Sequence, residues 1–220
     1  MEYLANMSFE DRFEFSLNNY YENLPSHKAF RRRFEYFLNK SKFQSLDRLI
    51  EIGAGNGEFA NFLSQKGFNI SVVEPSSDGQ AVIKEKYPHL EIVDSRPYEP
   101  ITIPNCEGKK FFFSFEVIEH CFDPHLFLES IFKSMEEGEY LLLSTPYHGY
   151  LKNLAISLLN RWDDHFTVFW KNGHIKFFSF DTISRMCKIV GFEIDSIEGY
   201  GRFPFFWRGM FILVRKPLGS

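Results

Sequence analysis

Three glycines at alternate positions follow a short apolar run early in the chain. The run LIEI at 49–52 is followed by GAGNG at 53–57, and helical periodicity begins directly after it. A glycine loop between a strand and a helix lets a ligand approach the backbone closely, and amide groups at the start of the helix can bind a carboxylate or a phosphate. The loop alone therefore indicates a ligand site without deciding which ligand.

Two common nucleotide loops do not fit this pattern. A dinucleotide fingerprint starting at Gly53 needs a glycine three residues after Gly55, where this chain has Glu58. The phosphate loop of nucleotide triphosphatases needs a Gly-Lys-Ser/Thr triplet, and none follows. A nucleotide-dependent oxidoreductase is disfavoured and stays a third hypothesis.

An acidic residue follows the next apolar run. Glu74 comes after Val72 and Val73, at a position where a carboxylate can accept hydrogen bonds from both hydroxyls of a ribose. A glutamate at a strand end is often only a surface residue, but its placement after a glycine loop favours ligand binding.

Histidines supply the second group of reactive side chains. Histidine can take a proton from an acceptor near neutral pH, and His120, His148, His165 and His174 fall in segments expected to face the site. We predict His120, His174 and His148 as catalytic residues. For each of them, a hydrogen-bonded or surface histidine is the alternative.

A metal site is a further alternative around position 118. Glu116, Glu119 and His120 have helical spacings of three and four, so one face could present two carboxylates and an imidazole to a divalent ion. Glu119 and His120 can equally serve only to fix the loop. We predict no metal ligand, and we expect Asp163-Asp164-His165 to be a cap or a salt-bridge cluster.

The elements that position these residues alternate between strand-like and helix-like patterns. From Arg48 onward this alternation predicts a Rossmann-like α/β fold, with a seven-stranded, mostly parallel sheet and helices on both faces. The expected strands are 48–52, 69–74, 90–93, 110–115, 139–144, 192–197 and 211–215. The expected helices are 58–65, 80–86, 124–136, 151–159 and 180–190. Residues 1–46 are expected to form a helical N-terminal extension, and residues 47–220 the main domain.

The alternation breaks after Pro146. Residues 147–178 are longer than an ordinary connection and follow the fifth strand, at the edge of the sheet where ligands bind. We interpret this insertion as an aromatic lid over an acceptor, with packing on the core or a dimer surface as alternatives. Its aromatic residues are Trp162, Phe166, Phe169, Trp170, Phe177 and Phe178.

Two blocks of sequence resemble a known family. LIEIGAGNG at 49–57 with VEP at 73–75 is similar to the opening motifs of class I S-adenosylmethionine-dependent methyltransferases. FSFEVIEH at 113–120, followed by Asp123-Pro124, resembles the branch that contains ubiquinone-biosynthesis O-methyltransferases and uncharacterised bacterial relatives. The turn before the fifth strand departs from the family pattern, because MEEG stands at 135–138.

The resemblance implies S-adenosylmethionine as the cofactor and S-adenosylhomocysteine as its product. The glycine loop would hold the methionine end, Glu74 the ribose, and the loop at Asp94-Ser95 would pass the adenine. The cofactor-binding residues that we expect are Glu51, Gly53, Ala54, Gly55, Gly57, Glu74, Pro75, Asp94, Ser95, Glu116 and Val117.

The charge and the cysteine content of the chain limit the partners and the compartment that we expect. The formal net charge of −4 and the pI near 6.0 give no positive field for nucleic acid. Three widely spaced cysteines and the absence of a signal or membrane-spanning pattern predict a cytoplasmic protein. We expect no membrane or nucleic-acid partner, and a monomer or a homodimer. We expect methyl transfer to oxygen of a small molecule or sugar-containing intermediate, with nitrogen and carbon as the alternative acceptor atoms. A catalytically silent cofactor-binding module or partner subunit with the same fold is the alternative.

Overall fold

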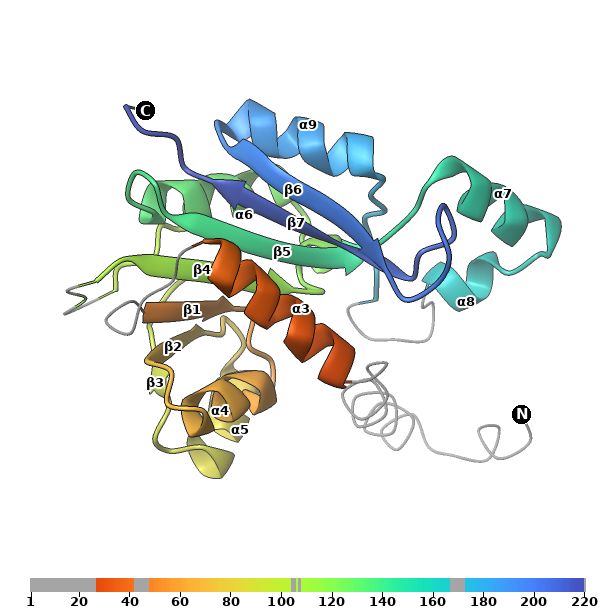
Figure 1. The fold of residues 1–220 in the computed structure, drawn as a ribbon. Helices are drawn as coiled ribbons and strands as arrows, with labels where there is room; N and C mark the ends of the chain where they lie inside the picture. Colours follow the sequence, from red (N-terminus) through yellow and green to blue (C-terminus); the bar gives the residue numbers. More distant parts are fainter. Residues whose placement is uncertain (1–26, 42–47, 104–105, 107, 167–172, 220) are drawn as a thin grey trace, which may run out of the picture.

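The computed structural model describes residues 27–41, 48–103, 106, 108–166 and 173–219 (Figure 1). Its seven strands form one sheet in the order β3-β2-β1-β4-β5-β7-β6. The strands are β1 Arg48–Ile52, β2 Ile70–Val73, β3 Glu91–Ile92, β4 Lys110–Phe115, β5 Tyr140–Pro146, β6 Glu193–Tyr200 and β7 Gly209–Arg215. Strands β1 to β5 pair in parallel, and β7 runs antiparallel between β5 and β6. Strand β6 therefore ends at the same edge of the sheet as β4 and β5.

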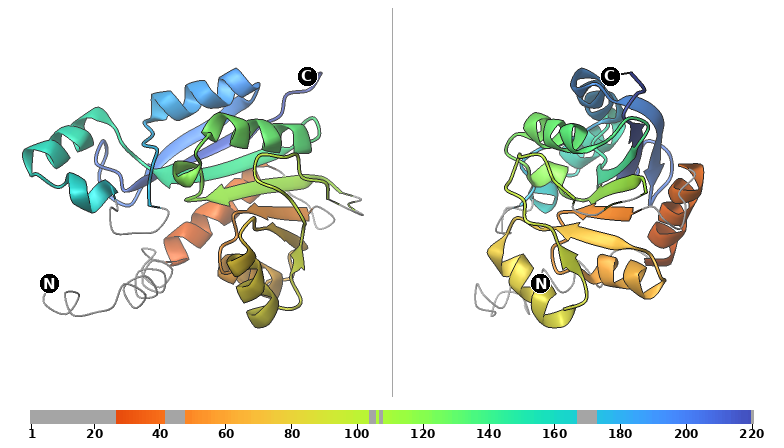
Figure 2. Two further views of the ribbon diagram at one scale, coloured as in Figure 1. Left: turned by 180° about the vertical axis from the view of Figure 1, so that it is seen from behind. Right: turned by 90° about the vertical axis from the view of Figure 1, so that its left-hand side faces the viewer.

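Helices cover both faces of this sheet (Figure 2). They are α3 His27–Lys40, α4 Glu58–Gln65, α5 Ser77–Lys86, the 3-10 turn η1 Ile118–His120, α6 Pro124–Ser134, α7 Tyr150–Leu158, α8 Trp162–Phe166 and α9 Phe180–Val190. Residues of α6 and α9 pack on one face, and those of α3, α4 and α5 pack on the other. No helix in the described part of the chain is long and apolar enough to span a membrane.

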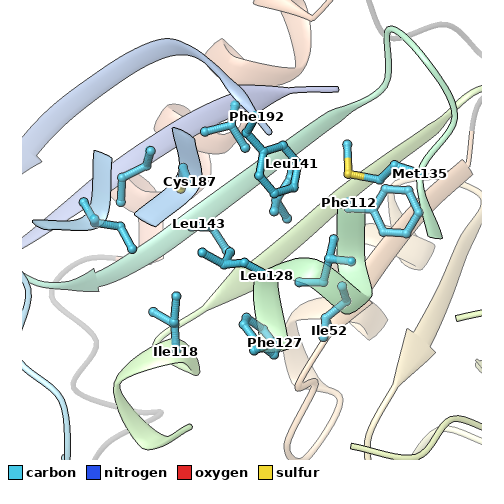
Figure 3. Packing of buried hydrophobic residues seen from close by; sticks show 14 of the residues in the cluster. Ile52, Phe112, Ile118, Phe127, Leu128, Met135, Leu141, Leu143, Cys187 and Phe192 are labelled. Atoms are coloured by element: carbon cyan, nitrogen blue, oxygen red, sulfur yellow. The ribbon is translucent and has the colours of Figure 1, made fainter. Parts of the chain in front are cut away.

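Each face has its own apolar core. Figure 3 shows Leu128 of α6 and Cys187 of α9 packed against Leu141 and Leu143 of β5; all four side chains are fully buried. The opposite core is aromatic: Phe34 of α3 is 1% exposed, and its ring lies 4.9 Å from that of Phe113 on β4. The many phenylalanines thus hold α3 on the sheet, consistent with the large apolar area that each ring buries.

The predicted α/β fold is confirmed, including its seven strands and its mostly parallel pairing. Helix α5 starts at Ser77, three residues before the predicted start, because the side chain of Ser76 caps it by accepting a hydrogen bond from Gly79 N. Helix α6 ends two residues early, because Met135 is extended. Strand β6 runs three residues further than predicted, to Tyr200. Of the predicted helical extension, residues 1–26 and 42–46 lie outside the described residues.

The insertion after β5 leaves and rejoins the sheet at one point. Tyr147 and Phe178 form a parallel bridge, and His148 N donates to Phe178 O at 2.8 Å. Between them, α7 and α8 stand beyond the carboxyl end of β5 (Figure 1). Of the predicted lid aromatics, Phe169 and Trp170 lie outside the described residues.

Candidate functional site

The glycine loop turns sharply between β1 and α4. Gly53, Gly55 and Gly57 all have positive φ angles, of 76°, 57° and 75°. A Cβ atom on Gly53 would lie 2.5 Å from Cγ2 of Val117, which is closer than side chains pack. Glycine is therefore required at position 53 both by the backbone and by its neighbour, and the loop lies directly against the segment that follows β4.

Glu74 joins this loop to the end of β2. Its carboxylate accepts hydrogen bonds from Gly55 N at 2.8 Å and from Ser76 N at 2.9 Å. The residue is only 6% exposed, whereas the adjacent Pro75 is exposed. The structure thus brings together the two predicted features, the glycine loop and the acidic strand end.

Glu51 is a buried acid beneath the loop. Burial raises the pKa of its carboxyl to about 8, an effect strengthened by the charge of Glu74 and opposed by a hydrogen bond with the backbone of Ala60. Its Oε2 atom has no hydrogen-bond partner among the described residues. Glu51 therefore retains unused hydrogen-bonding capacity next to the loop.

Asp94 and Ser95 follow β3 at the same edge of the sheet. Asp94 is exposed, and the hydroxyl of Ser95 donates to the carbonyl of Arg96 at 3.3 Å. This hydrogen bond is local to the turn and does not involve the glycine loop. The structure places both residues on the surface beside β2 and β3.

Glu116 directly follows β4 and has an unusual backbone conformation. Its φ angle is 55°, a left-handed value that is costly for a residue with a side chain and that marks functional positions in many proteins. Its Oε1 accepts hydrogen bonds from Ser144 Oγ at 2.7 Å and from Tyr200 Oη at 3.2 Å. Burial raises the pKa of Glu116. The strained backbone thus points the carboxylate at the ends of β5 and β6.

The structure does not form the helix that would place Glu116, Glu119 and His120 on one face, the arrangement considered as an alternative from their spacing. Only residues 118–120 form a turn, and it is a 3-10 turn that Glu116 precedes in left-handed conformation. Glu119 and His120 instead lie close to His174, and the rings of the two histidines are 4.9 Å apart. The three side chains that the tertiary structure brings together are therefore Glu119, His120 and His174, and Glu116 is not among them.

The insertion contributes two further histidines, His148 and His165, whose charges act on His174. The ring of His148 is 5.9 Å from that of His165, and its Nδ1 is 3.1 Å from Asn153 Oδ1. Burial lowers the pKa of His148 to about 4, assisted by the charge of Lys152, and burial lowers that of His174 to about 4, assisted by the neighbouring histidines. Both imidazoles are therefore neutral at neutral pH. Of the segment Asp163-Asp164-His165, the imidazole of His165 lies beside that of His148. The carboxylate of Asp164 forms a salt bridge of 2.7 Å with Arg161.

Sequence reasoning missed Lys152 and Tyr200. The ammonium of Lys152 is buried and donates to Tyr147 O at 2.5 Å and to Arg208 O at 3.4 Å, which fixes α7 beside the end of β5 and the start of β7. Burial and the charge of Arg202 lower its pKa to about 8. Tyr200 was missed because the predicted sixth strand stops at residue 197, whereas β6 continues to Tyr200. A sixth strand that ends at residue 200 would place the tyrosine at the same edge of the sheet as the end of β4.

Both the sequence and the fold of this chain are similar to those of methyltransferases. The profile of a family described as "Methyltransferase domain" matches residues 20–197. An uncharacterized methyltransferase of Alkaliphilus oremlandii is 44% identical over 45 residues, which are 20% of this chain and 21% of that protein. The match thus spans about a fifth of the curated relative.

Solved structures share the fold at low identity. A methyltransferase structure from Clostridium acetobutylicum, described as S-adenosylmethionine-dependent, aligns with a TM-score of 0.68 and 9% identity, covering 96% of this chain and 100% of that chain. A Haloferax volcanii putative methyltransferase, solved with the Trm112 methyltransferase activator, aligns with a TM-score of 0.58 and 14% identity, covering 83% and 88%. With the family profile matching most of its length, this chain belongs to the methyltransferase domain family.

Proposed function

We propose that the protein is an S-adenosylmethionine-dependent methyltransferase that acts on an oxygen of a small molecule or sugar-containing intermediate. The observation that carries the proposal is the bond between Gly55 N and Glu74, 2.8 Å long, within a loop of three left-handed glycines. Such a cradle, with a buried carboxylate at its rim, fits a ligand that carries both a charged amino acid end and a ribose. When bound, the cofactor supplies a methyl group activated on a sulfonium.

The residues of this chain have separable roles in the proposal. The loop 53–57 and Glu51 bind the amino acid end, and Glu74 accepts hydrogen bonds from the ribose. Asp94 and Ser95 line the adenine side. The side chain of Val117 lies against the glycine loop at Gly53, where the cofactor is proposed to bind. Glu116 and Val117 therefore border the reacting centre in this proposal.

Neutral imidazoles favour oxygen as the acceptor. A hydroxyl must lose its proton during transfer, and His148 and His174, each with a pKa lowered to about 4, are unprotonated bases at neutral pH. A neutral amine needs no such base before it reacts. His120, His148 and His174 are the proposed candidates for proton acceptance, while the insertion at 147–178 closes over the acceptor.

Binding and turnover test the proposal separately. Calorimetry with S-adenosylhomocysteine is expected to show saturable binding, and incubation with S-adenosylmethionine and a panel of phenols, catechols and sugar nucleotides is expected to release S-adenosylhomocysteine. Binding without turnover on any acceptor would favour the silent module. Absence of binding would overturn the cofactor assignment.

A partner protein is the specific alternative to autonomous activity. The Haloferax volcanii structure pairs a putative methyltransferase of the same fold with an activator. In that case turnover by this chain would appear only on addition of a partner, while S-adenosylhomocysteine binding would persist. The same acceptor panel, repeated in lysate of the native cell, distinguishes the two situations.

A further inference from the structure

Three side chains with metal-binding atoms converge beside the end of β4. One carboxylate oxygen of Glu119 and one ring nitrogen each of His120 and His174 lie within 4.8 Å of one another. Glu119 and His120 belong to η1, whereas His174 belongs to the segment that returns from the insertion. The backbone fixes the two segments together, because Ile175 N and Lys176 N both donate to Glu119 O at 3.0 Å.

Glu119 has an incomplete set of partners for a buried carboxylate. The residue is 0% exposed, and its Oε2 accepts a hydrogen bond from Thr145 Oγ1 at 3.0 Å. Its Oε1 is buried and has no hydrogen-bond partner among the described residues. Leaving such an oxygen without a donor or a cation costs folding free energy, so an unsatisfied buried carboxylate oxygen calls for a ligand.

The orientation of His120 favours a cation as that ligand. Its Nδ1 is 3.3 Å from the carbonyl of Gly173, and because a carbonyl only accepts, Nδ1 carries the hydrogen in the neutral ring. The other nitrogen, Nε2, then carries the lone pair and lies 4.0 Å from Oε1 of Glu119. A positive ion between these two atoms would be bound by both electron-pair donors. A ring whose other nitrogen donates to a backbone carbonyl is also the usual support of a metal-binding histidine.

We propose that Glu119, His120 and His174 bind one divalent first-row transition metal ion. Two imidazoles and one carboxylate suit zinc, iron or cobalt, whereas magnesium and calcium prefer sites built from oxygen alone. Three protein ligands leave coordination positions open, as in metal sites that bind a further small molecule. That an acceptor oxygen occupies such a position rests on the proposed function; metal binding itself does not. A metal ion here would use the lone pairs of His120 and His174, which leaves His148 as the proton acceptor among the three candidates.

Cobalt is the probe for a direct test. Tag-free full-length protein, stripped with a chelator, is titrated with Co²⁺ and followed by visible ligand-field absorption. We expect saturation at about one ion per chain, displacement by Zn²⁺, and no displacement by equal concentrations of Mg²⁺ or Ca²⁺. His174→Ala and Glu119→Gln are each expected to weaken Co²⁺ binding at least about tenfold, the scale of losses at metal sites.

A surface pair provides the matched control. His125 and Glu129 also form a histidine–glutamate contact, at 3.4 Å, but on the exposed side of α6. His125→Ala is expected to bind Co²⁺ as the wild type does. The melting temperature and S-adenosylhomocysteine affinity show whether each variant is folded and whether the cofactor site is separately intact.

Anomalous diffraction from Zn²⁺-soaked crystals of the wild type tests the same site without any substitution. A peak among the three side chains supports the proposal. It is overturned if the wild type shows no saturable Co²⁺ absorption, if folded variants at both positions bind as tightly as the wild type, or if the anomalous peak lies elsewhere. Displacement by Mg²⁺ would overturn the choice of a transition metal.

Discussion

The backbone N–H of Gly55 donates a hydrogen bond of 2.8 Å to Oε2 of Glu74, which ties the loop after β1 to the end of β2. This contact fixes the carboxylate against the glycine loop. A carboxylate that is already oriented loses little conformational entropy when a ligand binds, so the pair would be preorganised for the cofactor that we propose.

Replacing Glu74 tests its proposed contact with the ribose. Glu74→Ala is expected to weaken S-adenosylhomocysteine binding by about 1–3 kcal/mol, the cost of leaving buried polar groups without a charged partner. Calorimetry measures the change, and Glu85→Ala, an exposed position on α5, serves as the control. Affinity equal to that of the wild type in Glu74→Ala would contradict the ribose assignment.

Replacing Gly53 tests the close approach of the loop to Val117. Gly53→Ala adds a Cβ 2.5 Å from Val117 Cγ2 at a φ of 76°. At Gly67, with a φ of 86°, an added methyl group would meet nothing within 4 Å, so alanine there experiences the backbone strain alone. Gly53→Ala is therefore expected to lose roughly 1–3 kcal/mol more unfolding free energy than Gly67→Ala, the scale of overpacking. Urea denaturation of both variants makes the comparison, and equal losses would mean that the loop shifts freely away from Val117.

Glu51 makes stability depend on pH. Its pKa is raised from 4.5 to about 8 in the folded protein, so the folded state holds a proton that the unfolded chain releases. The stabilisation that this proton provides is fully present below pH 4.5 and is lost as the pH rises through about 8. Glu51→Gln is expected to flatten the profile over this range and to raise the melting temperature at pH 8, because the amide remains neutral where the buried carboxyl begins to ionise. Parallel melting profiles for the two proteins would show that Glu51 does not titrate in this way.

His174→Ala separates chemistry from cofactor binding. His174 lies in the returning part of the insertion, beside η1, whereas Glu74 lies at the end of β2. Loss of the His174 imidazole is therefore expected to lower turnover by about 10²–10⁴-fold and to leave S-adenosylhomocysteine affinity nearly unchanged. Steady-state kinetics and calorimetry give the two quantities, and the exposed His89→Ala is the control. If turnover and affinity fall together, His174 has a structural role.

Local sequence determined much of the scaffold. The bounds of β1, α4, β4 and α9 agree with those predicted. Their apolar periodicity and flanking glycines act within a few residues, so no distant contact is needed to specify them. The pairing of the glycine loop with Glu74 was also predictable, because consecutive parallel strands end at one edge of the sheet.

Tertiary structure alone decided how the remaining site residues meet. Tyr200 reaches Glu116 across 84 residues of sequence, because β7 inserts between β5 and β6 and brings the end of β6 to the same edge. His174 reaches Glu119 because the insertion returns beside η1. Spacing along the chain suggested a helix through Glu116, and the left-handed backbone at that residue excludes it. The sequence by itself determined the order of the seven strands, most of the helices and the glycine loop. The strand crossovers and the path of the insertion decided which carboxylates and imidazoles share a site.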